Sequence, residues 1–176
     1  MIEVVKATSA DIDRIVEIYD AVLSECEAGR CPVGWERGVY PERKDAEAAL
    51  ARDDLYVAKQ GGVIISTGII NQMQLDVYAE TDWEYEAEDD EVMVLHTLAT
   101  DPAYGGSGAG TAIANYYENY AREQGCKVLR IDTQAQNDVA RSFYMRLGYR
   151  EVGILPCIFN GIQGVNLVML EKKLQL

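Results

Sequence analysis

The middle of the chain, residues 92–148, constrains the fold more than any other stretch of the sequence. An apolar run ends shortly before a glycine cluster at residues 105–110, and a helix-like pattern begins directly after it. A second apolar run, Val128–Ile131, leads into a second helix-like pattern that stops at Gly148. A strand, a glycine turn and a helix start in this order bring backbone N–H groups and the positive end of a helix dipole together. The stretch therefore predicts a site for a phosphorylated ligand.

Two familiar phosphate-binding motifs fit this stretch poorly. A P-loop needs Gly-Lys followed by Ser or Thr, and no such triplet follows these glycines, so a P-loop is excluded. A dinucleotide-binding unit places its glycines directly after its first strand, whereas residues 101–104 intervene here. Asp132 stands near the position of that unit's acidic residue. A nicotinamide-dependent oxidoreductase therefore remains an alternative.

Strand-like and helix-like patterns alternate along the chain and predict a single α/β domain over residues 1–176 with a mixed sheet. Helices are expected to begin after a cap at Ser9, at Pro41, at Gly108 and at Asp138. Residues 76–91 carry eight Asp and Glu residues after Tyr78 and are expected to form a surface excursion with a ragged strand at its start. Strands are expected over residues 2–7, 55–59, 63–70, 92–100, 126–133, 149–158 and 165–174.

The charge balance argues against several classes of partner. A net charge of −13 disfavours nucleic acid and anionic membranes, since both need a basic protein surface. The same charge fits a cationic amine substrate, or serves solubility alone. The four cysteines lack metal-site spacing, and the single histidine, His96, excludes a His-rich metal site, so no metal is expected. Without a signal-like N-terminus or a bilayer-length apolar run, a reduced, cytoplasmic chain is expected.

The runs HTLATDPAYGGSGAG and IDTQAQNDVARSFYMRLGYREVG together resemble the GNAT superfamily of N-acetyltransferases. That family has a strand, an Arg/Gln-x-x-Gly-x-Gly/Ala turn, a helix and then an Asn-x-x-Ala…Tyr-x-x-x-Gly-Phe/Tyr signature. The matching residues of the signature here are Asn137, Ala140, Tyr144, Gly148 and Tyr149. The resemblance implies a mixed, mostly antiparallel sheet of about seven strands flanked by about four helices, with a central pair of parallel strands splayed apart.

The resemblance also implies acetyl-CoA as the co-substrate. Backbone groups of Leu98 and Thr100 would bind the pantetheine arm as an added strand would, and the glycine turn would hold the pyrophosphate. Gly105 and Ser107 stand where the family has side chains that contact the pyrophosphate, so we expect weaker cofactor binding. The full set of expected cofactor-binding residues is Leu98, Ala99, Thr100, Gly105, Gly106, Ser107, Gly108, Ala109, Gly110, Thr111, Asn137 and Tyr144.

Three residues are expected to carry the chemistry. By its place in the family signature, Tyr144 is the candidate general acid that protonates the departing thiolate. The Leu98 N–H would polarise the thioester carbonyl. His96 is the candidate base because its ordinary pKa lies near neutrality, with Glu91 acting through water as the alternative. The expected substrate-binding residues are Tyr19, Trp35, Tyr40, Trp83 and Glu91.

The expected function is direct transfer of an acetyl group from acetyl-CoA to the primary amine of a small molecule or peptide. A cationic acceptor fits the acidity of the chain. The altered turn at Gly105 leaves a second hypothesis open, a non-catalytic acyl-CoA-binding or regulatory module. Similar proteins commonly form homodimers through the closing hairpin, so a homodimer is also considered.

Overall fold

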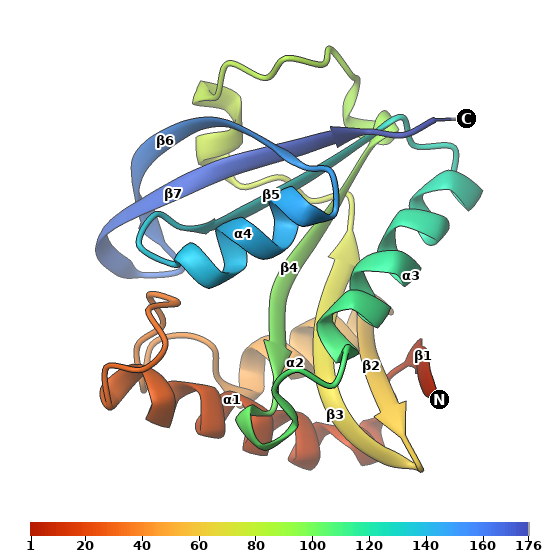
Figure 1. The fold of residues 1–176 in the computed structure, drawn as a ribbon, viewed down its shortest axis with the longest axis vertical. Helices are drawn as coiled ribbons and strands as arrows, with labels where there is room; N and C mark the ends of the chain where they lie inside the picture. Colours follow the sequence, from red (N-terminus) through yellow and green to blue (C-terminus); the bar gives the residue numbers. More distant parts are fainter. Residues whose placement is uncertain (176) are drawn as a thin grey trace.

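The computed structural model describes residues 1–175, and a seven-stranded sheet in the order β1-β2-β3-β4-β5-β7-β6 forms its centre (Figure 1). Every strand pairing is antiparallel except β4 with β5, as the sequence predicts. The strands are β1 (Ile2–Lys6), β2 (Leu55–Gln60), β3 (Val63–Asn71), β4 (Val92–Thr100), β5 (Val128–Gln134), β6 (Arg150–Phe159) and β7 (Ile162–Lys173). The helices are α1 (Ile12–Glu27), α2 (Arg43–Ala51), α3 (Ala109–Glu123) and α4 (Asp138–Arg146).

The helices cover both faces of the sheet (Figure 1). Successive side chains of a strand point to opposite faces, and β2 shows the division clearly. Tyr56 and Ala58 pack in the core beneath α3, whereas Leu55 and Val57 pack beneath α1 and α2. Residues 72–91, the yellow-green segment at the top of Figure 1, cover the second face at its β5 and β7 end. The fold is the mixed α/β arrangement that the sequence predicts.

Two expected helix starts lie at other residues. The first helix is preceded by a capping box in which the Thr8 N–H donates to the Asp11 carboxylate at 2.8 Å, so Ser9 is not the cap. The second helix begins at Arg43 after a capping box led by Glu42, two residues beyond the expected start at Pro41. In both places the side chain that satisfies the free N–H groups sets the boundary.

The acidic excursion contains no strand at its start, contrary to expectation. Residues Asp76–Glu80 form a 3₁₀ helix, η2, and Asp89–Glu91 form another, η3. Val77 and Tyr78 of η2 are buried against the sheet face. These two side chains therefore contact the sheet, although the segment is not a strand of it.

The parallel strands β4 and β5 separate soon after they meet. They pair only where Val92–Val94 face Val128–Arg130. The hydroxyl group of Tyr117 on α3 lies at the point of separation, 2.6 Å from the Met93 carbonyl oxygen and 3.1 Å from the Arg130 carbonyl oxygen. Beyond it, one edge of β4 is left without a partner strand, which is the splay that the sequence predicts.

A bulge bends β4 at the splay. Gly68 of β3 opposes both Thr97 and Leu98, and Thr97 takes a φ of 51°. A Cβ atom on Gly68 would lie 3.1 Å from the Leu95 side chain and 3.3 Å from that of Ile113. The missing side chain lets the core close around the bulge, so that position favours glycine.

Within residues 1–175, no helix has both the length and the apolar character that crossing a membrane would need. The four cysteines are free thiols. No cluster of His, Cys, Asp and Glu side chains in the same residues is arranged to hold a metal ion.

Candidate active site

A cavity of about 310 Å³ opens at the splay between β4 and β5. Its wall combines the bulge of β4, the end of β5, the start of α4, the loop before α2 and the closing hairpin. His96, Thr97 and Leu98 all line it, because the bulge interrupts the alternation of the strand. The cavity brings together these residues predicted from the sequence: His96, Leu98, Asn137, Tyr144, Trp35 and Tyr40.

Three of the expected substrate-binding residues lie outside the cavity wall. Tyr19 is buried and packs edge-on against Trp35, with ring centroids 6.4 Å apart. Trp83 packs on the far part of the sheet face and donates its indole N–H to the Tyr78 carbonyl oxygen at 2.9 Å. Glu91 forms an ion pair with Lys127 at the start of β4. Aromatic and acidic character alone does not distinguish such packing residues from substrate contacts.

Tyr144 reaches the cavity from helix α4. Its ring is buried edge-on against the rings of Phe143 and Tyr149, with centroids 5.1 Å and 5.7 Å away. Burial raises the pKa of Tyr144 above its usual range, so the phenol keeps its proton at neutral pH. Within residues 1–175 the hydroxyl group has no hydrogen-bond partner, which leaves it available to a ligand.

The unpaired edge of β4 offers backbone groups to the cavity. The Asp101 N–H bonds to the Ile65 carbonyl of β3 at 2.9 Å. Since N–H directions alternate along a strand, the N–H groups of Leu98 and Thr100 point away from β3 and toward the splay. Ala99 is buried, and its carbonyl oxygen accepts a hydrogen bond from the hydroxyl group of Ser66 on β3 at 2.8 Å. The available donors are those of Leu98 and Thr100.

The glycine turn presents a row of free N–H groups at the start of α3. Gly106 and Gly108 adopt φ values of 76° and 89°, a left-handed conformation that favours glycine. The N–H groups of Gly106, Gly108, Gly110 and Thr111 have no partner among the described residues. The Ser107 hydroxyl instead accepts a bond from the Ala109 N–H at 3.3 Å. Such donors at the N-terminus of a 15-residue helix suit a phosphate group.

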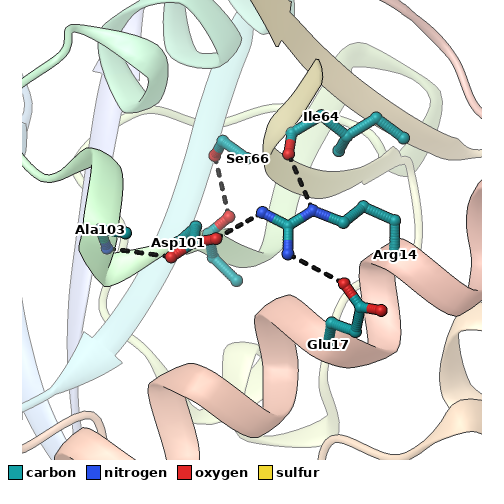
Figure 2. A network of polar contacts seen from close by, with 7 residues as sticks. Arg14, Glu17, Ile64, Ser66, Asp101 and Ala103 are labelled. Atoms are coloured by element: carbon teal, nitrogen blue, oxygen red, sulfur yellow. Dashed lines mark hydrogen bonds and ion pairs between the residues drawn. The ribbon is translucent and has the colours of Figure 1, made fainter.

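An ion pair clamps the base of this turn to helix α1 (Figure 2). The Arg14 guanidinium bonds to the Asp101 carboxylate and to the Ile64 carbonyl, the latter at 3.1 Å. The other oxygen of Asp101 accepts from the Ala103 N–H at 2.9 Å and caps the 3₁₀ turn η4 (Pro102–Tyr104). Arg14 also pairs with Glu17 on its own helix. The clamp fixes where β4 ends and the glycine turn begins.

His96 is held in one protonation form by its neighbours. The amide N–H of Asn71 donates to the Asp54 carboxylate at 2.9 Å, which fixes the orientation of the amide. The Asn71 oxygen therefore faces His96 Nε2, 2.9 Å away, and that nitrogen carries the hydrogen. Burial lowers the pKa of His96 to about 4, so the ring is neutral at physiological pH.

Asp132, at the end of β5, is the cavity residue whose role the sequence did not reveal. Its carboxylate lines the cavity beside Tyr144 and accepts a hydrogen bond from the Tyr78 hydroxyl at 2.7 Å. Burial raises the pKa of Asp132 to about 6, partly offset by the bond from Tyr78. An acidic residue twelve positions before Tyr144 is visible in the sequence, but only the fold brings the two to one cavity.

Comparison with known proteins decides the family. A sequence profile described as the acetyltransferase (GNAT) family matches residues 15–149, which is most of the chain. The chain belongs to the GNAT acetyltransferase family.

Relatives of this GNAT chain share modest identity with it. It is 33% identical over 75 residues to an uncharacterised N-acetyltransferase of Methanocaldococcus jannaschii, covering 43% of this chain and 33% of that one. It is 25% identical over 114 residues to the N-alpha-acetyltransferase RimI of Mycobacterium tuberculosis, covering 65% and 63%. The GNAT chain thus spans between a third and two thirds of the length of these relatives.

Solved structures share the GNAT fold along the whole chain. A GNAT-family acetyltransferase of Streptococcus agalactiae has a TM-score of 0.82 at 17% identity, over 99% of this chain and 96% of that one. A putative acetyltransferase of Salmonella typhimurium, yncA, solved with its cofactor acetyl-CoA, has a TM-score of 0.70 at 17% identity, over 99% and 94%. At these identities the likeness concerns the fold.

Proposed function

We propose that this chain transfers an acetyl group from acetyl-CoA to the primary amine of a small molecule or peptide by direct attack. One observation carries the proposal: a proton donor, Tyr144, and a proton acceptor, Asp132, line one cavity at the splay of the sheet. Membership in the GNAT family supports the same reaction class. Acetyl-CoA supplies a thioester, whose carbonyl carbon accepts the amine nitrogen.

The residues around the splay fit acetyl-CoA. The free N–H groups of the glycine turn suit a pyrophosphate, and the unpaired edge of β4 suits the amides of a pantetheine arm. The structural neighbour yncA was solved with acetyl-CoA, which supports the assignment. The turn at Gly105 and Ser107 carries no cationic side chain, so binding relies on backbone donors. A missing charge-assisted hydrogen bond weakens binding by roughly 1.5–3 kcal/mol.

Asp132 is the better base of the two candidates in the cavity. A base works best when its pKa lies near the operating pH. The pKa of Asp132 is about 6, whereas that of His96 is about 4 and its Nε2 is occupied by Asn71. We therefore assign proton removal from the ammonium group of the acceptor to Asp132. His96 orients the acceptor as a neutral ring.

The remaining steps use groups on β4 and α4. The amine attacks the carbonyl carbon, and the Leu98 N–H donates to the carbonyl oxygen as it gains charge. When the carbon–sulfur bond breaks, Tyr144 gives its proton to the departing thiolate sulfur. The nitrogen still carries one hydrogen too many after attack, and it loses this proton as the amide forms, which matches the proton that Tyr144 gave to the sulfur. Asp132 releases the ammonium proton to bulk water after product release, so the reaction liberates one proton overall.

The cavity wall favours a cationic acceptor with an apolar body. Asp45 and Asp132 supply carboxylates, and Trp35, Tyr40 and Phe159 supply aromatic surface. Two aromatic contacts hold this wall, with centroids 6.4 Å and 5.5 Å apart. An ammonium group gains from both carboxylates and aromatic faces. A small amine or a peptide N-terminus meets this description, and the relative RimI is named for N-alpha-acetylation.

The first test is calorimetric titration with acetyl-CoA, with NADH and NADPH as controls. Saturable binding of acetyl-CoA alone is expected, followed by release of free thiol when a panel of primary amines is added. Binding without thiol release from any amine would favour the non-catalytic module. Binding of NADH in preference to acetyl-CoA would reject the proposal.

The second test separates the two bases. Asp132→Asn is expected to remove the acidic limb of the pH profile of kcat/KM near pH 6, because that limb reports the free enzyme's base. His96→Ala is expected to keep this limb at a reduced rate. The opposite pattern would return the assignment to His96.

A further inference from the structure

Several side-chain contacts hold the acidic excursion, residues 76–91, against the sheet, which a solvated loop does not require. Tyr78 is buried on η2, and its hydroxyl reaches across to the Asp132 carboxylate. The Trp83 indole N–H bonds to the Tyr78 carbonyl oxygen at 2.9 Å, and the two rings pack edge-on with centroids 5.2 Å apart. These contacts order the turn that carries Tyr78.

Two buried charges of the sheet hold the same segment. The Arg130 guanidinium lies 4.3 Å from the centroid of the Trp83 ring and donates to Gln74 Oε1 at 2.7 Å and to the Tyr85 carbonyl at 3.2 Å. The Glu171 carboxylate accepts the N–H of the residue before Tyr85 at 2.6 Å. Burying these charges is costly, so their use here points to a requirement for a fixed excursion.

The geometry of β5 links this anchor to the active site. Arg130 and Asp132 are two residues apart on one strand, so their side chains share a face. Arg130 binds the excursion, and Asp132 receives the hydroxyl that the excursion delivers. Tyr78 and Asp132 are 54 residues apart in sequence, so only the docked segment brings them together.

The surroundings of Asp132 leave Tyr78 as its hydrogen-bond partner. The titratable groups that face the carboxylate are Tyr40 from the loop before α2, Tyr78 from η2, Tyr144 from α4 and Cys157 from β6. Among residues 1–175, Tyr78 is the side chain hydrogen-bonded to Asp132. None of these groups is a cation, so the phenol is what stabilises and orients the charged carboxylate.

We propose that Tyr78 is a positioning residue: its hydroxyl fixes the Asp132 carboxylate toward the acceptor, and the excursion docked on Arg130 and Glu171 serves to hold it there. This inference rests on the proposed function, in which Asp132 is the base. It gives the acidic excursion a part in catalysis that is separate from charge steering.

The test is the pH profile of kcat/KM in Tyr78→Phe. Loss of the bond removes a group that favours ionised Asp132, so the acidic limb should move to higher pH by about one unit. Tyr149→Phe is the matched control, because the Tyr149 hydroxyl is buried without a partner among the described residues. In Tyr149→Phe the acidic limb of kcat/KM should lie at the same pH as in the unmodified protein.

A second readout avoids dependence on turnover. The pKa of Asp132, measured from the pH dependence of its carboxyl ¹³C NMR signal, should rise in Tyr78→Phe and stay unchanged in Tyr149→Phe. An unchanged Asp132 titration in a folded Tyr78→Phe protein would overturn the positioning role. Should Asp132→Asn keep the acidic limb, the base assignment itself fails, and that result is distinct from a failure of Tyr78 alone.

Discussion

At the Asp132 carboxylate, suitability for proton transfer and stability of the fold oppose each other. Burial raises the pKa to about 6, above an ordinary value near 3.9 for an unfolded chain. The stabilisation from the protonated form is therefore complete below about pH 4 and is lost as the pH rises through about 6. At neutral pH the fold contains a half-buried anion whose ionisation lowers stability.

Asp132→Asn is therefore expected to raise the free energy of unfolding at pH 7 by about 2–3 kcal/mol, with the gain vanishing near pH 4. Urea unfolding at the two pH values measures it. An equal effect at both values would mean that ionisation of Asp132 is not the cause.

Tyr144 combines a retained proton with a free hydroxyl in the cavity. Tyr144→Phe is expected to lower kcat by about 10²–10⁴-fold, the usual contribution of a general acid, while acetyl-CoA binding stays nearly unchanged. Steady-state kinetics and calorimetry measure the two quantities. Tyr149→Phe, outside the cavity wall, is the control. Parallel loss of turnover and binding would give Tyr144 a packing role instead.

Single residues were predictable where a local motif contains them. Asn137 and Tyr144 belong to one short signature, and both line the cavity. Asp132 was not predictable, because its pKa depends on burial and on Tyr78 in a distant segment. Trp83 is an aromatic residue of the kind that contacts a cationic substrate, but the Arg130 guanidinium covers the face of its ring. Contacts between distant segments decide such roles.

Among the elements, the glycine turn depends on helix α1 as much as on its own sequence. The Arg14 and Asp101 side chains are both partly buried, at 29% and 12% exposure. Arg14→Met is expected to raise KM for acetyl-CoA about tenfold, equivalent to about 1.4 kcal/mol, with a smaller change in kcat. The reason is that the turn loses its fixed position relative to β4.

Arg43→Met provides the matched control for this change. Arg43 pairs with Asp13 on α1 across the surface, at 48% and 85% exposure, and such pairs contribute little. Its KM for acetyl-CoA should equal that of the unmodified protein. A rise in both variants would indicate a general effect of positive charge near α1.

Most elements followed from periodicity, and the exceptions have a common cause. The helical spacing of buried Ile15, Ile18 and Val22 on α1 appears in the sequence because the core dictates it. The segment from Asp76 to Glu80 has no such period, since it packs on the sheet through two side chains only. The bulge at Thr97 left no pattern either, because it depends on Gly68 across the sheet.

The whole molecule is a sheet in two halves that share a short seam. Strands β1–β4 and β5–β7 pair along Val92–Val94 and Val128–Arg130, and the Tyr117 hydroxyl of α3 bonds to a carbonyl of each side. Because this one sheet runs from residue 2 to residue 173, we propose that residues 1–176 act as a single domain. A ligand bound in the splay contacts both halves and should stabilise them together.

Acetyl-CoA at a hundred times its Kd is expected to stabilise the fold by about 2.7 kcal/mol and to raise Tm by about 5–10 °C. Thermal unfolding monitored by circular dichroism measures the shift. NADH at the same concentration is the control and should leave Tm in place. A rise of Tm with both nucleotides would point to non-specific anion binding.

The two tryptophans lie where their fluorescence can report on two separate events. Trp35 lines the cavity, and Trp83 lies beneath the Arg130 guanidinium, where the excursion is fastened. The chain has no other tryptophan. Replacing either tryptophan by phenylalanine leaves a single tryptophan in the chain. The fluorescence of Trp35 alone then reports the binding of an acceptor in the cavity, and that of Trp83 alone reports the docking of the excursion, without an added dye.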